Sequence, residues 1–185
     1  MMEQLNHQSR RDRFGSKINR DHSPILMFVV PWLSIMLGSL TPLLPIIAPA
    51  PILPPMGYLL LLSWRMLRPG SLPLWAGFPL GMFDDMFSGQ PLGSGILLFS
   101  LTLIALDLLE LRFPWRRFWQ NWIIAALFMF AYLVVAALVS GARIELLHLT
   151  LLVPQLLLSL TMFPILMALA NFLDWVRLLL VWRTS

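Results

Sequence analysis

Long runs of apolar residues separated by short polar segments are the feature that most constrains this chain. A helix needs about 20 apolar residues to cross a hydrocarbon core of about 30 Å. A soluble fold could not bury this much apolar surface, because hydrophobic residues make up 58% of the 185 residues and charged ones only 12%. The sequence therefore predicts an all-α membrane protein of about six transmembrane helices. The predicted spans are residues 24–47, 56–67, 72–87, 92–111, 119–140 and 147–172.

The ends of the chain and the second span are less regular. The span 56–67 is short, and it either extends backward through Ile52 and Leu53 or enters only half of the membrane. The stretch 173–182 is predicted as an amphipathic end at the membrane surface or as a helix leaving the membrane. The predicted organisation is a disordered basic tail (1–23), one transmembrane helical domain (24–173) and an interfacial or cytoplasmic end (174–185).

Basic residues alternate between the two sides of the predicted membrane domain. Loops in the cytoplasm carry an excess of Lys and Arg. With the amino terminus inside, every Lys and Arg except Arg143 falls on the cytoplasmic side. An odd number of spans would break this alternation at one loop. We therefore expect a multi-pass membrane protein with both termini in the cytoplasm.

Few residues could support catalysis or metal binding. The chain has no cysteine, which removes disulfides, thiol nucleophiles and cysteine-based metal sites. Its three histidines are scattered, Ser88 has no base at a useful spacing, and Asp107 and Glu110 are expected near the membrane face opposite to the other acids of the spans. The net charge of +4 does not indicate nucleic-acid binding, because the basic residues form short clusters between apolar runs. We expect no enzyme, cofactor or metal.

The segment 77–93 carries the most information. Glycines and one acid recur in it every four residues, at Gly77, Gly81, Asp85, Gly89 and Gly93. Steps of four keep side chains near one face of a helix. Gly77 and Gly81 thus predict a small-xxx-small surface that another helix backbone can approach closely. Gly89 to Gly93 predicts a turn, because Pro91 cannot continue the helix.

Two adjacent aspartates, Asp84 and Asp85, lie within this predicted span. Neighbouring residues on a helix point about 100° apart, so the two carboxylates should differ in role. We expect one to face the helix bundle, bound to backbone amides of the turn or to a partner, and the other to reach headgroup water. A structural role is favoured, since a charge inside the bilayer is costly unless it is paired.

The pattern Gly77-Phe78-x-x-Gly81-x-x-x-Asp85-x-x-Ser88-Gly89-x-x-Leu92-Gly93 resembles the signature region of the MreD family of rod shape-determining membrane proteins. The preceding stretch is also similar to that family, with Pro54, an apolar run and Trp64 at a matching distance. The matched region covers 54–93. By position, Asp85 is the acid that matches, and Asp84 is an addition to the family's pattern. The resemblance makes the eight residues written in this pattern the candidate helix-packing and partner site.

The resemblance implies a non-catalytic scaffold in the bacterial inner membrane that helps to maintain rod cell shape. It implies binding to the periplasmic scaffold MreC and help in positioning the peptidoglycan synthase, the glycosyltransferase RodA with its penicillin-binding transpeptidase. The filament MreB would be an indirect partner in the cytoplasm. It also implies a bundle similar to the S-components of energy-coupling-factor vitamin transporters.

The alternative is a small-molecule-binding subunit of a membrane transporter. That function requires a polar cavity at membrane depth. Residues such as Asp85, Asn121, Gln155, Thr161 and Asn171 would have to build it, and they are few and scattered along the chain.

Overall fold

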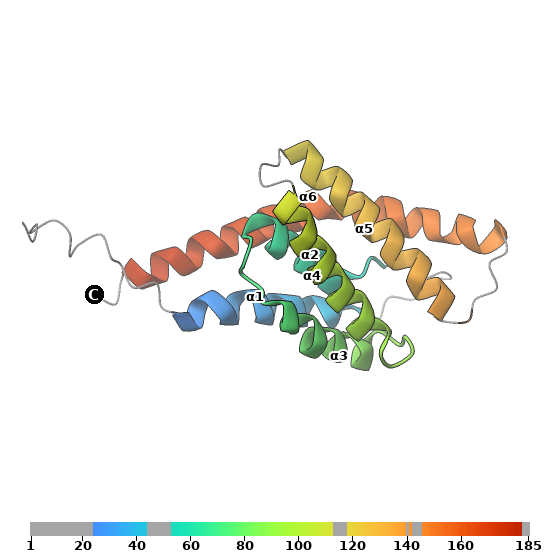
Figure 1. Ribbon diagram of the computed structural model, residues 1–185, viewed down its shortest axis with the longest axis horizontal. Coiled ribbons are helices and arrows are strands. Elements are labelled where there is room, and N and C mark those ends of the chain that lie inside the picture. Colours follow the sequence, from blue (N-terminus) through green and yellow to red (C-terminus); the bar gives the residue numbers. More distant parts are fainter. Residues whose placement is uncertain (1–23, 44–52, 113–117, 140, 142–145, 183–185) are drawn as a thin grey trace, which may run out of the picture.

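The computed structural model describes residues 24–43, 53–112, 118–139, 141 and 146–182, and the regular elements within them are all helical (Figure 1). The α-helices are α1 (Pro24–Ser39), α2 (Met56–Leu67), α3 (Gly77–Phe87), α4 (Ser94–Arg112), α5 (Phe118–Val139) and α6 (Leu146–Trp182). Two short 3-10 helices also occur: η2 (Thr41–Leu43) follows α1, and η3 (Leu74–Ala76) leads into α3. The all-helical class predicted from the sequence is confirmed.

Proline and glycine set the bounds of the shorter helices. Pro55 caps the start of α2, and Gly70 follows its end with a φ of 86°, a conformation that glycine adopts without strain. Gly89, with a φ of 70°, likewise follows the end of α3. Proline does not always end a helix here, because Pro154 and Pro164 both lie inside α6.

The helices fall at the six predicted spans, but their lengths differ. Within the described ranges, three helical segments are long and apolar enough to cross a membrane: Ser94–Arg112, Trp119–Val139 and Leu152–Arg177. The helix α1 ends at Ser39, earlier than predicted, and residues 44–47 of that predicted span lie outside the described chain. The stretch 173–182 is no separate element, because α6 runs through it without a break. The number of crossings stays a prediction, as does the predicted tail 1–23, which lies outside the described residues.

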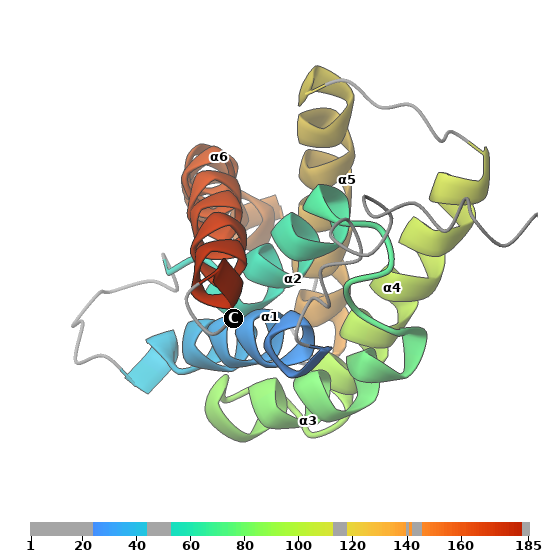
Figure 2. The same cartoon turned by 90° about the vertical axis from the view of Figure 1, so that its left-hand side faces the viewer.

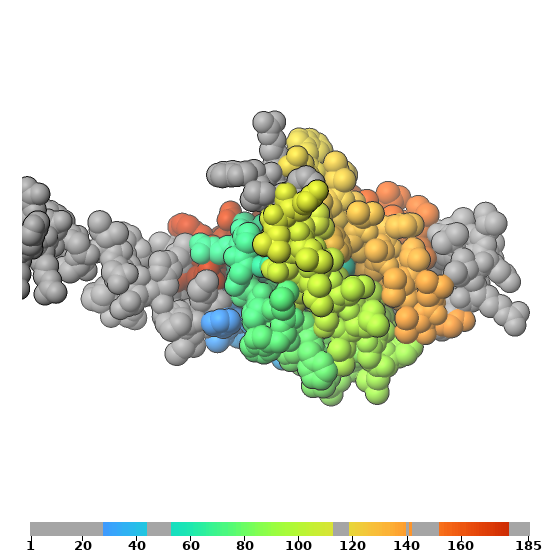
Figure 3. Space-filling view, in the orientation of Figure 1, coloured from blue at the N-terminus to red at the C-terminus, as the bar shows by residue number. Residues whose placement is uncertain are grey.

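The helix α2 lies in the middle of the bundle, with α1, α4, α5 and α6 around it (Figure 2). Ten of its twelve residues are buried, which explains why a helix this short can be almost entirely apolar. The helix α3 packs beside α4 and α1. The face seen in Figure 3 is formed by α3, α4 and α5 together with the end of α2 and the segment that joins α2 to α3.

Tyr58 of α2 ties three helices together in the core. Its hydroxyl lies 2.8 Å from the Thr102 hydroxyl of α4 and donates to the Phe128 carbonyl of α5 at 3.3 Å. Its ring packs on Phe99 and Tyr132, with centroid distances of 5.7 and 4.2 Å. Buried aromatic groups of this kind need a partner for the hydroxyl, and here the partners fix the position of α2.

Candidate functional site

Asp85, near the end of α3, closes the amino terminus of α4. Its carboxylate accepts the backbone N–H groups of Gly95 at 2.6 Å and of Gly93 at 2.8 Å. It also accepts the N–H of Ile96 at 3.3 Å and the hydroxyl of Ser94 at 3.2 Å. The first N–H groups of a helix have no partner inside that helix, and the negative charge also suits the helix dipole. A carboxylate from one helix thus caps the next one along the chain.

Gly77 and Gly81 hold α3 directly against the backbone of α4. A Cβ atom at Gly81 would lie 2.5 Å from the carbonyl oxygen of Gly95 and 2.6 Å from the Cα of Ile96. A Cβ at Gly77 would lie 2.6 Å from the Cα of Ser100. These distances are too short for any side chain, and the atoms met are backbone atoms that cannot turn aside. The glycine surface is therefore used inside this chain, between α3 and α4.

The turn between α3 and α4 has the geometry that the Asp85 contacts require. Ser88 follows the last residue of α3, and its hydroxyl accepts the N–H of Gln90 at 3.4 Å. Gly89 and Gly93 have φ values of 70° and 100°, and the Gly93 N–H turns back toward the Asp85 carboxylate. The same conformation leaves Leu92 83% exposed at the tip of the turn.

Asp84 is buried on another side of α3, with 5% of its surface exposed. It lines a cavity of about 390 Å³ that also meets Ser39, Gln90, Tyr132 and Gln155. The prediction that the second aspartate reaches headgroup water is wrong, because the ends of α1, α2 and α5 cover it. In contrast to Asp85, it accepts no backbone N–H among the residues described.

The residues expected to build a transporter-like cavity are not gathered in one place. Of them, only Gln155 lines the cavity. Thr161 and Asn171 are exposed on α6, Asn121 lies at the start of α5, and the Asp85 carboxylate is bound to the start of α4. These residues therefore do not build a shared polar cavity, in line with their scatter along the sequence.

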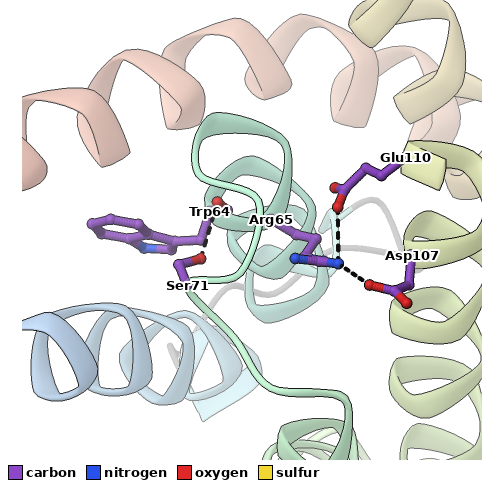
Figure 4. Close-up of polar contacts among 5 residues, drawn as sticks. All are labelled: Trp64, Arg65, Ser71, Asp107 and Glu110. Atoms are coloured by element: carbon purple, nitrogen blue, oxygen red, sulfur yellow. Dashed lines mark hydrogen bonds and ion pairs between the residues drawn. The ribbon is translucent and has the colours of Figure 1, made fainter. Parts of the chain in front are cut away.

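Charged residues gather at the other end of the bundle, at the ends of α2 and α4 and on α6 about two turns before that helix ends. The Arg65 guanidinium is 4% exposed and lies 2.6 Å from Asp107 and 2.9 Å from Glu110 (Figure 4). These ion pairs join the end of α2 to the end of α4. A buried guanidinium needs such partners, because leaving it unpaired would cost several kcal/mol.

A second set of ion pairs joins α2 to α6. The Asp174 carboxylate lies 2.7 Å from Arg68 and 2.5 Å from Arg177. The Arg177 guanidinium also lies 6.0 Å from the centre of the Trp64 ring. The part of α6 around Asp174 and Arg177 is thus held against the end of α2.

The sequence matches the family model of the rod shape-determining protein MreD over residues 22–180, nearly the whole chain. The chain belongs to the MreD family. As a member of the MreD family it is a rod shape-determining membrane protein, and three of its helices fit membrane insertion by length and composition. No curated protein and no solved structure matches it significantly.

The eight predicted site residues of this MreD chain divide into two groups by position. Most of them build the contact between α3 and α4: Gly77, Gly81, Asp85, Ser88, Gly89 and Gly93. Phe78 and Leu92 instead point outward, with 57% and 83% of their surfaces exposed. The structure brings the first group together at one joint, and a role of any of the eight in binding a partner stays a prediction.

Two features of this MreD chain were missed by sequence reasoning. The ion pairs of Arg65 were not foreseen. A signal for them existed, because Arg65 and Asp107 lie near the ends of two predicted spans that finish on the same side of the membrane. The cavity beside Asp84 had no local signal, because its walls come from five helices.

Proposed function

We propose that this chain is a non-catalytic scaffold of the bacterial inner membrane that binds MreC and helps to position the peptidoglycan synthase, RodA with its penicillin-binding transpeptidase. The MreB filament is an indirect partner of this assembly. The observation that carries the proposal is the family match over residues 22–180. The structure supports it, because the signature residues hold two helices together.

The proposal includes six crossings with both termini in the cytoplasm. The ends of α2 and α4 and the Asp174 region of α6 gather with their charged residues at one end of the bundle. The ends of α1, α3 and α5 line the cavity at the other. Helices that alternate in direction through a membrane produce this arrangement. The charged end, with Arg65, Arg68 and Arg177, is proposed as cytoplasmic under the positive-inside rule.

The outward face of α3 is the proposed contact with MreC. It carries Phe78, Met82 and Met86, which are 57%, 46% and 65% exposed and recur every four residues. The inward face of the same helix is locked on α4 by glycine, so α3 is a rigid support for this apolar surface. Large apolar side chains on a rigid element are typical anchors of protein contacts.

Co-purification in mild detergent tests the proposal. We expect the double variant Phe78→Ala with Met82→Ala to lose most of the MreC that copurifies with the wild type. The matched control is Leu127→Ala on α5, which removes an equally exposed apolar side chain, 64% exposed, from another face. Full retention of MreC by the double variant at normal abundance would refute the α3 surface.

The proposal also keeps the likeness to the S-components of energy-coupling-factor transporters. The cavity beside Asp84 is the feature that favours it, and that cavity also favours the alternative of a small-molecule-binding subunit. A scaffold and a binding subunit differ in one measurable respect, since only the second loses its function when the cavity is filled.

A further inference from the structure

The cavity beside Asp84 has the size and the walls of a small-molecule site. Its volume of about 390 Å³ falls in the range of about 300–1,000 Å³ that is usual for ligand pockets. Much of the wall is apolar, with Met56, Leu133, Ala137 and Leu152 among its members. A few polar side chains converge on it, as in sites that orient a ligand.

Most of these polar groups already have partners in the protein. The Gln155 amide donates to the Leu53 carbonyl at 2.9 Å, the Thr41 hydroxyl donates to the Gly38 carbonyl at 2.8 Å, and the Gln90 amide lies 3.4 Å from the Tyr132 hydroxyl. These bonds fix the walls. They leave the Asp84 carboxylate and the Ser39 hydroxyl as the groups that a ligand would meet.

Asp84 and Ser39 are the two polar residues of the cavity that remain available to a ligand. Both line the cavity and both are more than nine-tenths buried. The Ser39 hydroxyl lies beside Asp84 and interacts with it, but it makes no hydrogen bond of good geometry to the part of the chain that is described. Buried polar groups are normally paired, and a buried carboxylate without donors is unfavourable.

The electrostatic setting of the cavity favours a positive ligand. No Lys, Arg or His is among the described residues that line it. The carboxyl-terminal turns of α1, α3 and α5 converge there, and such helix ends carry a partial negative charge. The start of α2 beside Asp84 carries the opposite partial charge and supports the ionised carboxylate, but it donates no hydrogen bond to it.

We propose that the cavity lined by Asp84 and Ser39 binds a primary ammonium group attached to a compact aliphatic body. The ammonium would donate to the carboxylate and the hydroxyl, and the body would rest on the apolar wall. A single metal ion would leave most of the volume empty, and the described residues hold no group of three metal-ligating side chains. The ammonium group can come from the headgroup of an aminophospholipid or from a free amine. This inference goes beyond the scaffold function and does not depend on MreC.

The test uses the full-length protein in nanodiscs, with thermal unfolding followed by tryptophan fluorescence. One arm titrates free ethanolamine into phosphatidylcholine nanodiscs, and the other replaces part of that lipid with phosphatidylethanolamine. Phosphatidylcholine is a suitable background, because its headgroup carries a positive charge but no N–H donor. The variants are Asp84→Asn, Ala137→Phe, which fills the cavity from its wall, and Asp107→Asn as a control acid at the other end of the bundle.

We expect at least one arm to raise the unfolding temperature of the wild type in a saturable way. Asp84→Asn should weaken the apparent affinity by about 10- to 100-fold, the loss of one charge-assisted contact, and Asp107→Asn should leave it unchanged. A response to ethanolamine alone identifies a free amine, and a response to the lipid alone identifies the headgroup. If Asp84→Asn does not fold, loss of the response in Ala137→Phe carries the same weight. Equal responses in the wild type and the folded cavity variants, or none in the wild type, would overturn the inference.

Discussion

Adding a single methyl group at Gly81 should separate α3 from α4. The new Cβ would lie 2.5 Å from the Gly95 carbonyl oxygen, whereas ordinary contacts begin at 3.4 Å. The difference between these two distances is about 0.9 Å. The atoms that would clash with the new Cβ are backbone atoms of α4, so no side chain can rotate away to relieve the clash. A shift of this size along the 2.6 Å bond from Gly95 to Asp85 would lengthen it beyond the range of a good hydrogen bond.

The expected loss has two parts. Overpacking of a tight contact costs about 1–3 kcal/mol, and a weakened hydrogen bond to a charged group about 1.5–3 kcal/mol. Together they predict that Gly81→Ala lowers the free energy of unfolding by about 2.5–6 kcal/mol. Relative to a total stability of about 5–15 kcal/mol this is a large effect. The unfolding temperature should fall by about 5–24 °C.

Thermal unfolding of the purified protein in detergent measures this change, since eight tryptophans report on the fold. Met82→Ala is the matched control, because Met82 is the next residue of α3 but is 46% exposed on the outer face. Gly95→Ala should act at the same contact from the side of α4, so the double variant should lose less than the sum of the two. An unfolding temperature of Gly81→Ala within 2 °C of the wild type would refute the argument from close approach.

Three further results are expected. Asp85→Ala should impair rescue of cell shape more than Asp84→Ala, because only Asp85 caps a helix; equal tolerance in a complementation assay would contradict this. Arg65→Met should destabilise the protein in thermal unfolding by about 1–3 kcal/mol, since it removes the ion pairs with Glu110 and with Asp107, which is 43% exposed. Exposed Arg112→Met should change little. The chain has no cysteine, so a single introduced cysteine is the only thiol that can be labelled. Pro91→Cys should react with an impermeant maleimide in intact spheroplasts, whereas Arg112→Cys should react only after lysis. The reverse pattern would invert the proposed topology.

The sequence was informative where structure is local. The turn after α3 was predicted from Gly89, Pro91 and Gly93, because their backbone preferences act within a few residues. The spacing of Gly77 and Gly81 predicted a close helix contact, and the partner is the next helix along the chain.

The parts that the sequence could not supply depend on distant segments. The burial of Asp84 follows from the ends of α1, α2 and α5, which no local pattern places around it. Arg65 meets Asp107 across 42 residues of sequence. Proline was also ambiguous, since Pro154 lies within a helix while Pro55 stands at the start of one. Tertiary packing decides such cases, and it cannot be derived from spacing alone.

The capping of α4 by Asp85 has a consequence for how the protein enters the bilayer. If α4 entered the bilayer alone, it would bring unsatisfied N–H groups into lipid. If α3 entered alone, it would bring an uncompensated carboxylate. The hydrocarbon supplies a hydrogen-bond partner for neither. Residues 77–112 should therefore partition from the translocon as one preassembled hairpin. Changes in that hairpin would act during biogenesis, by reducing how much protein reaches the membrane, before any partner is encountered.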